Sequence, residues 1–183
     1  DKTGTITYGN RLAADFIPVG GAARSDLIRC AALTSLRDDT PEGKSTLELA
    51  HRLGGDSRES PGSVFFEFTA QTRMSGVDLP DGTKVRKGAA EAIEQYVREQ
   101  GGQIPKDLHE QVDKVSSLGG TPLTVCENDR ILGVIYLKDT VKSGMAERFE
   151  RLRAIGIKTI MCTGDNPLTA ATIAKEAGVD GFL

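Results

Sequence analysis

Two short segments near opposite ends of the chain carry residue types that suit phosphoryl chemistry. The first, residues 1–7, reads Asp-Lys-Thr-Gly-Thr-Ile-Thr. The Asp1 carboxylate could act as a nucleophile toward phosphorus, while Lys2 and the Thr3 hydroxyl could hold phosphoryl oxygens. Gly4 would let backbone N–H groups approach the same oxygens. Taken alone, this segment could equally be a frayed terminus, so its interpretation depends on the second segment.

The second segment, residues 162–167, reads Cys-Thr-Gly-Asp-Asn-Pro and has the same ingredients. It follows a short apolar stretch and precedes a helical pattern, so it should connect a strand to a helix. The Thr163 hydroxyl and the Gly164 N–H could hold phosphoryl oxygens, and the N-terminus of the following helix would favour the same anion. We expect both segments to meet at the carboxyl edge of one parallel sheet, where such folds bind ligands. The alternative is a loop that only caps a helix.

The elements that must position these segments fall into two types. Between residues 12 and 136, β-type stretches alternate with helical patterns, and turn signals at 80–82 and 128–129 predict antiparallel hairpins. After residue 137, the order helix, strand, loop, helix is typical of a parallel α/β sheet. The sequence therefore predicts an α/β protein in which an α+β domain, an antiparallel sheet with flanking helices, is inserted into a parallel α/β domain. We expect a host domain formed by residues 1–11 and 138–183, with residues 12–137 as the insert.

Periodicity and turn residues also place the individual elements. Ser25 and Thr40 are expected to cap the first two helices, because their hydroxyls can accept from free N–H groups. The expected helices cover residues 26–36, 41–53, 89–100, 105–118, 145–155 and 167–177. The expected strands cover 64–68, 72–79, 83–87, 122–127, 130–137 and 157–162.

Composition narrows the classes of function. The 183 residues are 38% hydrophobic and 27% charged, with a net charge of −3, which argues against nucleic acid or an anionic membrane surface as a general partner. No apolar run is long enough to span a bilayer. The cysteines (Cys30, Cys126 and Cys162) lack CxxC spacing, so we expect buried, reduced thiols. With only two histidines, a His-based metal centre is not expected.

Together, the two segments resemble the phosphorylation motif and the second phosphate-binding motif of P-type ATPases, within the haloacid-dehalogenase-like superfamily. Lys87-Gly88-Ala89 resembles the lysine motif of the nucleotide domain in the same family. The resemblance covers essentially the whole chain in order. Within the family, residues 40–45, 68–76 and 137–139 look most like the potassium-transporting Kdp branch. The sequence departs from the family at Ala90, the fourth position of the lysine motif, where proline is more common. This difference leaves Lys87 unaffected.

The resemblance implies roles at the phosphorylation site. Asp1 would become an aspartyl phosphate and would bind Mg²⁺ together with the Thr3 carbonyl. Lys2 would lie beside it in the motif. The residues that would line the phosphate site are Thr163, Gly164 and Asp165.

The resemblance also implies an ATP site in the insert. Phe68 would stack on the adenine ring, and Lys87 would lie deep in the same pocket, with Gly88 allowing close approach. Other positions matching the nucleotide site of the Kdp type are Asp38, Glu42, Gln71, Arg73 and Ser75. Asp139 matches the aspartate at which the nucleotide domain rejoins the phosphorylation domain, a hinge position.

Several parts of the family's architecture have no counterpart in this sequence. The strand before Asp1, the later acidic Mg²⁺ motif, the actuator domain and the membrane helices are absent. We therefore expect a fragment, the cytoplasmic region of a plasma (inner) membrane protein, that binds ATP with little or no turnover. In the parent complex, the resemblance implies a channel-like potassium-binding subunit and small accessory subunits as partners.

Three alternatives remain open at this point. A phosphatase of the same superfamily is disfavoured because Thr3 stands where many such enzymes carry a second aspartate as general acid. A heavy-metal pump is disfavoured because neither His51 nor His109 precedes proline, whereas that branch typically has a His-Pro pair. The third alternative is a regulatory module that binds adenine nucleotides without turning them over.

Overall fold

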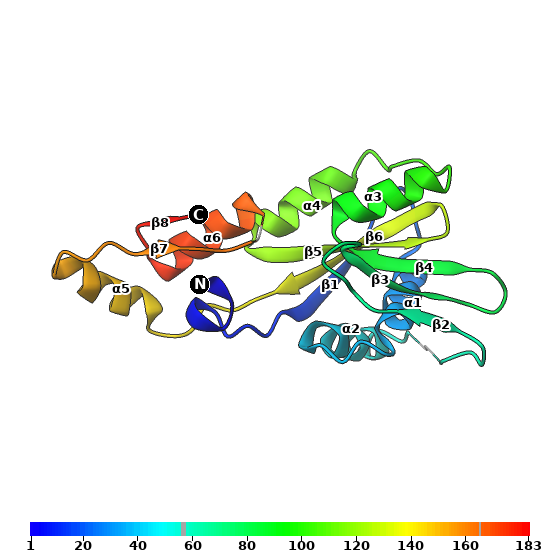
Figure 1. Cartoon of the computed structure of the whole chain (residues 1–183), viewed down its shortest axis with the longest axis horizontal. Helices are drawn as coiled ribbons and strands as arrows, with labels where there is room; N and C mark the ends of the chain where they lie inside the picture. The colour runs from blue at the N-terminus through cyan, green and yellow to red at the C-terminus, as the bar shows by residue number, and fades with distance from the viewer. Residues whose placement is uncertain (56–57, 165) are drawn as a thin grey trace.

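The computed structural model describes residues 1–55, 58–164 and 166–183. In these residues the larger sheet has six antiparallel strands in the order β1-β6-β5-β4-β3-β2 (Figure 1). Its strands are β1 (Leu12–Pro18), β2 (Val64–Phe66), β3 (Met74–Asp78), β4 (Lys84–Gly88), β5 (Gly120–Glu127) and β6 (Arg130–Lys138). A second, parallel pair consists of β7 (Ile160–Met161) and β8 (Gly181–Phe182).

Helices cover both faces of the large sheet, and each face has its own apolar core. On one face, α1 (Arg24–Ser35) and α2 (Pro41–Arg52) pack over strand residues such as Val85 and Val125. On the other face, α3 (Ala90–Glu99) and α4 (Leu108–Ser117) pack over Cys126 and Val134. Because successive strand residues point to opposite faces, neighbours such as Val125 and Cys126 contribute to different cores.

A third core lies at the other end of the molecule, where both termini are found (Figure 1). It is formed around α5 (Met145–Ala154), α6 (Pro167–Ala177) and the β7–β8 pair. Ile6, from the first chemical segment, and Met161, from the strand before the second, belong to this same buried cluster. One small core therefore supports both segments.

Two sets of contacts connect the large sheet to this end: an antiparallel bridge between residues 7–8 and 140–141, and hydrogen bonds from α6. Thr7 forms a β-bridge with Val141, and the Tyr8 N–H donates to the Thr140 carbonyl at 3.0 Å. The hydroxyls of Thr169 and Thr172, on α6, donate to the carbonyls of Gly120 and Ser117, each at 2.9 Å. The end of the molecule that holds the termini is thus also docked against the α4–β5 turn.

The predicted fold class is confirmed, and most predicted elements are found within a few residues of their expected bounds. Thr40 caps α2 as predicted, since its hydroxyl accepts from the Gly43 N–H at 3.0 Å. The predicted cap at Ser25 is wrong, because the helix begins at Arg24, two residues earlier than predicted, and its capping position is Ala23. No helix in the described ranges is long and apolar enough to cross a membrane.

Two predicted strands are shorter than expected, and local hydrogen bonds explain both. The 64–68 strand ends at Phe66 because Thr69 starts a turn, in which its hydroxyl accepts from the Thr72 N–H at 3.0 Å. The 157–162 strand is reduced to Ile160–Met161 because the Ile157 N–H still donates to the Leu152 carbonyl, at 3.0 Å, at the end of α5. As a result, Phe68 lies in a connecting segment and not in a strand.

Candidate functional site

A buried lysine marks the centre of the candidate site in the large sheet. The Lys87 side chain is only 4% exposed and lies on the α1 side of β4. Its Nζ donates to Asp38 Oδ2 at 2.8 Å and to Ser35 Oγ at 2.9 Å. A buried ammonium requires such partners, because desolvation of an unpaired charge is costly.

The junction between α1 and α2 holds Asp38 in place. The Thr40 N–H donates to Asp38 Oδ1 at 3.2 Å, and the Thr40 hydroxyl donates to the same oxygen at 2.5 Å. Gly43 is required by this arrangement, since a Cβ there would lie 2.3 Å from Asp38 Cγ. The cap of α2 and the counter-ion of Lys87 are therefore parts of one hydrogen-bonded unit.

The pKa values of Lys87 and Asp38 are both lowered, but for different reasons. Burial lowers the pKa of Lys87, and the opposing effects of Asp38 and then Glu42 only partly compensate. Burial alone would raise the pKa of Asp38, but the charge and hydrogen bond of Lys87, together with the Thr40 hydrogen bonds, bring that pKa below its ordinary value. The pocket is thus suited to a further anionic or hydrogen-bonding group near Lys87.

Strand pairing brings two more predicted residues to Lys87. Ser75 lies directly opposite Lys87 in the β3–β4 ladder and is itself buried. Gly88 lies opposite Met74, and a Cβ on Gly88 would be 2.3 Å from the Arg73 carbonyl oxygen. Gly88 therefore permits the close approach of the two strands next to Lys87.

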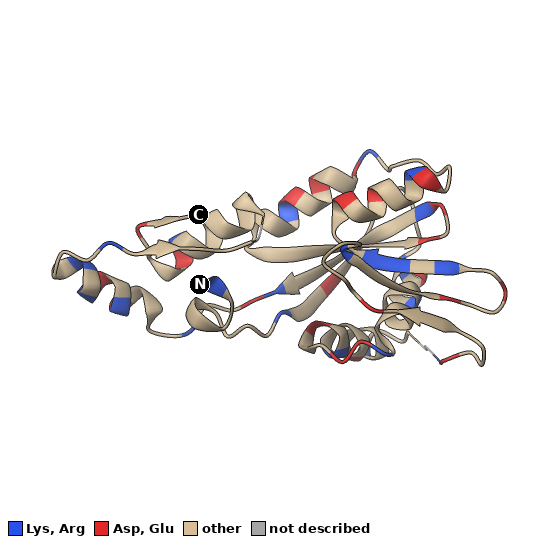
Figure 2. Cartoon of the chain, viewed as in Figure 1, with Lys and Arg blue, Asp and Glu red and all other residues tan. Residues whose placement is uncertain are grey.

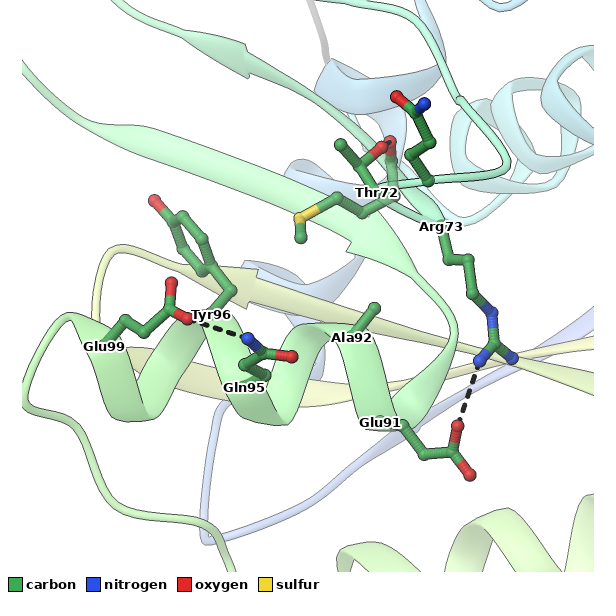
Figure 3. A pocket seen from close by; sticks show the side chains of 9 residues that line it. Thr72, Arg73, Glu91, Ala92, Gln95, Tyr96 and Glu99 are labelled. Carbon is green, nitrogen blue, oxygen red and sulfur yellow. Dashed lines mark hydrogen bonds and ion pairs between the residues drawn. The ribbon is translucent and has the colours of Figure 1, made fainter.

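Two other predicted residues point elsewhere. Gln71 and Arg73 line a hollow of about 300 Å³ on the α3 side of the sheet. Figure 3 shows Arg73 reaching toward Glu91 at the start of α3, and the two side chains form an ion pair at 3.0 Å. In this conformation the Arg73 guanidinium is directed away from Lys87, although its backbone (φ 52°) adjoins Gly88.

Phe68 lies on the surface. Its side chain is 60% exposed, in the segment of residues 67–73 that joins β2 to β3. A second hollow, of about 430 Å³, lies beside this segment; its lining residues are Phe65, Phe66, Glu67, Thr69, Thr72, Met74, Ser75 and Arg86. Figure 2 shows that the neighbouring strand β4 carries a run of basic residues, which favours an anionic ligand nearby.

The Asp1 segment is anchored by its lysine. Lys2 is 1% exposed, and its Nζ lies 3.8 Å from Asp139 Oδ2. The other Asp139 oxygen accepts from the Gly9 N–H at 3.2 Å. Lys2 is therefore directed toward Asp139, directly after β6, in this structure, whereas Asp1 and Thr3 are exposed.

The second phosphate-type segment begins directly after β7. The Thr163 N–H donates to the Leu183 carbonyl at 2.9 Å, and Gly164 is exposed with open space around it. Asn166 caps α6 by accepting from the Leu168 N–H at 2.7 Å, so this segment has the helix-capping role that we expected. Asp165 lies outside the described residues.

The expectation of buried cysteines is correct for two of the three. Burial raises the pKa of both Cys30 and Cys126 to about 12, which makes these thiols unreactive at neutral pH. Cys162 is exposed, contrary to prediction, because β7 ends one residue before it.

The described residues do not form a metal-binding cluster. Within residues 1–55, 58–164 and 166–183, no three His, Cys, Asp or Glu side chains are grouped as metal ligands. Asp1 nevertheless exposes a carboxylate two residues from the Thr3 carbonyl. This donor set suits Mg²⁺, which binds through one or two carboxylates and completes its shell with water and substrate phosphates.

Sequence reasoning missed two residues that shape the lysine pocket and its surroundings. Ser35 accepts a hydrogen bond from Lys87 and donates one to the Ala31 carbonyl at 2.8 Å. Arg86 is 11% exposed and packs between aromatic rings on the α3 side. Nothing in their local sequence distinguishes them from a helix-end serine and a surface arginine.

Comparison with known proteins identifies the family. The sequence profile of the haloacid dehalogenase-like hydrolases matches residues 1–183, the whole chain. The chain belongs to the haloacid dehalogenase-like hydrolase family. Within this family, the chain is 68% identical to the potassium-transporting ATPase ATP-binding subunit of Clostridium acetobutylicum and 59% identical to that of Deinococcus radiodurans. Both matches cover 100% of this chain and 27% of the relative, so the chain spans about a quarter of these proteins.

Solved structures of ATPases resemble this fold. A zinc-transporting PIB-type ATPase in its E2·Pi state matches with a TM-score of 0.65 and 27% identity, over 99% of this chain and 28% of that one. The catalytic domain of the CPx-ATPase CopB-B matches with a TM-score of 0.67 and 18% identity, over 100% and 59% of the two chains. The resemblance to P-type ATPases is confirmed by these matches.

Proposed function

We propose that this chain is the nucleotide-binding region, with part of the phosphorylation region, of a potassium-transporting P-type ATPase. The nucleotide-binding domain would comprise residues 12–137, and residues 1–11 and 138–183 would form the incomplete phosphorylation domain. The whole-chain identity of 68% to a potassium-transporting ATPase ATP-binding subunit favours potassium over the zinc named for the structural neighbour, whose identity is 27%.

The observation that carries the proposal is the buried Lys87. Its ammonium donates to Asp38 and Ser35, and Ser75 lies opposite Lys87 in the β3–β4 ladder. The exposed aromatic ring of Phe68 is available on the adjoining segment. A fixed cation and an exposed aromatic ring on the same half of the sheet suit a nucleotide, which combines hydrogen-bonding and anionic groups with a flat base.

Each residue of the site then has a proposed role. Phe68 stacks on adenine, and Lys87 binds the nucleotide deep in the pocket. Asp38 and Glu42 favour the charged form of Lys87. Gly88 lets β3 and β4 approach closely beside Lys87, and Ser75 lies on the Lys87 face. Gln71 and Arg73, which line the hollow on the α3 side in this structure, would border the bound nucleotide. Arg73 would have to leave Glu91 to contact the nucleotide, a change that an exposed ion pair allows at little cost.

Phosphoryl transfer would occur at the other end of the chain. Closure of the insert on the phosphorylation domain would bring the γ-phosphate to Asp1, whose carboxylate oxygen attacks phosphorus as the bond to the ADP oxygen breaks. Thr163, Gly164 and Asp165 would hold the phosphoryl oxygens, and Lys2 would have to turn away from Asp139 to join them. Mg²⁺, held by Asp1 and the Thr3 carbonyl, would neutralise charge on the phosphoryl group when bound.

The parent protein would be a membrane pump whose cytoplasmic region includes this chain. Its partners would be a channel-like potassium-binding subunit and small accessory subunits. The absence of a second aspartate at position 3 fits an aspartyl phosphate that persists until a conformational step releases it.

A nucleotide titration followed by two-dimensional ¹H–¹⁵N NMR tests the proposal. ATP should shift the amide signals of residues 67–73, Ser75, Lys87 and Gly88, and Lys87→Met should abolish most of these shifts. Lys106→Met, at an exposed position before α4, is the matched control and should bind like the wild type. If ATP shifts none of these signals in the wild-type chain, the proposed nucleotide site is wrong.

A further inference from the structure

A row of residues across four strands contains an arginine that the proposed site does not use. Phe66, Gly76, Arg86 and Cys126 are successive partners across β2, β3, β4 and β5. They point to the α3 side of the sheet, opposite to Lys87. The Arg86 guanidinium carbon lies 4.8 Å from the centre of the Phe66 ring and 5.4 Å from that of Tyr96, on α3.

The chain makes specific room for this side chain. Gly76 lies between Arg86 and Phe66 in the row, and a Cβ on Gly76 would be 2.6 Å from Arg86 Cδ. Arg86 Nη1 donates to the carbonyls of Val77 at 3.2 Å and Val85 at 3.0 Å. Arg86 Nη2 forms an ion pair with Asp78 at 2.7 Å. At 11% exposure, the guanidinium is thus fixed from several directions.

The position of Phe66 gives this contact its consequence. Phe66 is the last residue of β2, a three-residue strand that lies at the edge of the sheet beside β3. The segment of residues 67–73, which carries the exposed Phe68, starts directly after it. A short edge strand has few hydrogen bonds to hold it, so side-chain contacts at its end decide how firmly the following segment is placed.

We propose that Arg86 is a positioning residue for adenine-nucleotide binding, which holds Phe66 against α3 and thereby fixes the segment that presents Phe68. This inference rests on the proposed function of the Phe68–Lys87 pocket. Strand β4 then serves the pocket from both faces: Lys87 contacts the nucleotide, and the preceding residue orders the aromatic platform. Lysine cannot replace arginine here, because only the planar guanidinium can stack between two rings and reach two carbonyls and a carboxylate.

The test uses the absence of tryptophan from this chain. Phe68→Trp introduces a unique fluorophore that reports on residues 67–73 and can still stack on adenine. In this background, Arg86→Lys should weaken ATP binding about tenfold, which corresponds to about 1.4 kcal/mol. It should also lower the fluorescence anisotropy of Trp in the nucleotide-free chain, because the segment gains local motion.

A matched control separates positioning from general loss of an ion pair. Arg29→Lys changes another part-buried arginine, which pairs with Glu127 at 2.7 Å, and should alter neither ATP affinity nor anisotropy. Phe66→Leu removes the ring from the other side at a 44% exposed position, where the fold should tolerate it, and should reproduce the effects of Arg86→Lys.

The outcomes distinguish the two proposals. If the Phe68→Trp chain and the wild type both fail to bind ATP, the proposed function is wrong and this inference is overturned with it. If both bind ATP, and Arg86→Lys and Phe66→Leu leave affinity and anisotropy unchanged, the role of Arg86 alone is overturned.

Discussion

The Lys87–Asp38 pair predicts that its two halves respond very differently to substitution. The Lys87 side chain is 4% exposed and that of Asp38 is 20% exposed. Asp38→Asn would leave a buried ammonium with the Ser35 hydroxyl and an amide in place of its counter-ion. Removing one partner of a buried pair typically costs 3–5 kcal/mol, and because water reaches the Asp38 position, we expect about 3 kcal/mol.

Lys87→Met should behave differently, because it removes the more deeply buried of the two charges and with it the larger desolvation cost. The lowered pKa of Lys87 means that the folded protein disfavours its ammonium form even with Asp38 present. Methionine has a similar length and fills the apolar part of the site. Asp38 would keep its bonds to Thr40 and gain water. The free energy of unfolding should therefore change by no more than about 1 kcal/mol, while ATP binding weakens at least about tenfold.

Urea unfolding followed by circular dichroism at pH 7, with ATP titration of each variant, measures both effects. The pH dependence adds a second check. Because its folded-state pKa is lowered, Lys87 should make the wild type more stable as pH rises from that lowered value toward 10.5, and Lys87→Met should lack this rise. The lowered pKa of Asp38 contributes stability above about pH 4 that is lost in more acidic solution. If Lys87→Met costs as much stability as Asp38→Asn, the reasoning from burial is refuted.

Three further predictions concern the close approach of two strands at Gly88, the buried Lys2–Asp139 pair and the stability of the fold in acid. Gly88→Ala should cost about 2 kcal/mol in urea unfolding, because its Cβ would lie 2.3 Å from a carbonyl oxygen, whereas Gly181→Ala meets no atom within 4 Å and should change little; equal effects would contradict this. Asp139→Asn should destabilise the chain by about 3 kcal/mol and speed tryptic cleavage near residues 138–144, since the carboxylate is 2% exposed beside Lys2; unchanged cleavage would speak against an anchoring role. The Asp180 pKa is lowered to about 2 by a backbone hydrogen bond from Thr159 and by a hydrogen bond from Arg153. The ionised carboxylate should therefore stabilise the fold above about pH 4, and this contribution should be lost as the pH falls toward 2. Asp180→Asn should reduce the change in melting temperature over this pH range, and an unaltered pH dependence would exclude the carboxylate as its source.

The fold class could be predicted from the sequence because its signals are local. The alternation of apolar residues in the hairpins and the spacing of apolar residues in the helices depend on near neighbours only. Thr40-Pro41-Glu42 predicted the start of α2 correctly, and the structure confirms the cap. The length of β2 could not be predicted, since the hydroxyl of Thr69 competes with continuation of the strand.

The residues of the candidate nucleotide site were predicted from the family resemblance and not from their local setting. Lys87 was singled out because Lys87-Gly88-Ala89 resembles the lysine motif of the nucleotide domain in P-type ATPases. Ser35 and Arg86 carried no such signal. Their partners come from other elements, as with the contact from Ser35 to Lys87 across 52 residues, and only the folded chain brings them together.

Gly76 in β3 and Gly88 in β4 help to fix how these two strands pair, and therefore which faces of the sheet Arg86 and Lys87 occupy. Gly76 and Gly88 lie on the face of Arg86, and a Cβ on either would meet a backbone oxygen of the neighbouring strand at 2.2–2.3 Å. Ser75, Val77 and Lys87 occupy the opposite face, which is buried under α1. A one-residue slip of β4 would exchange the two faces, placing Arg86 at the acidic α1–α2 junction and Lys87 between the aromatic rings. The two glycines therefore restrict this pair of strands to the register in which the lysine faces the proposed nucleotide pocket and the arginine supports it from behind.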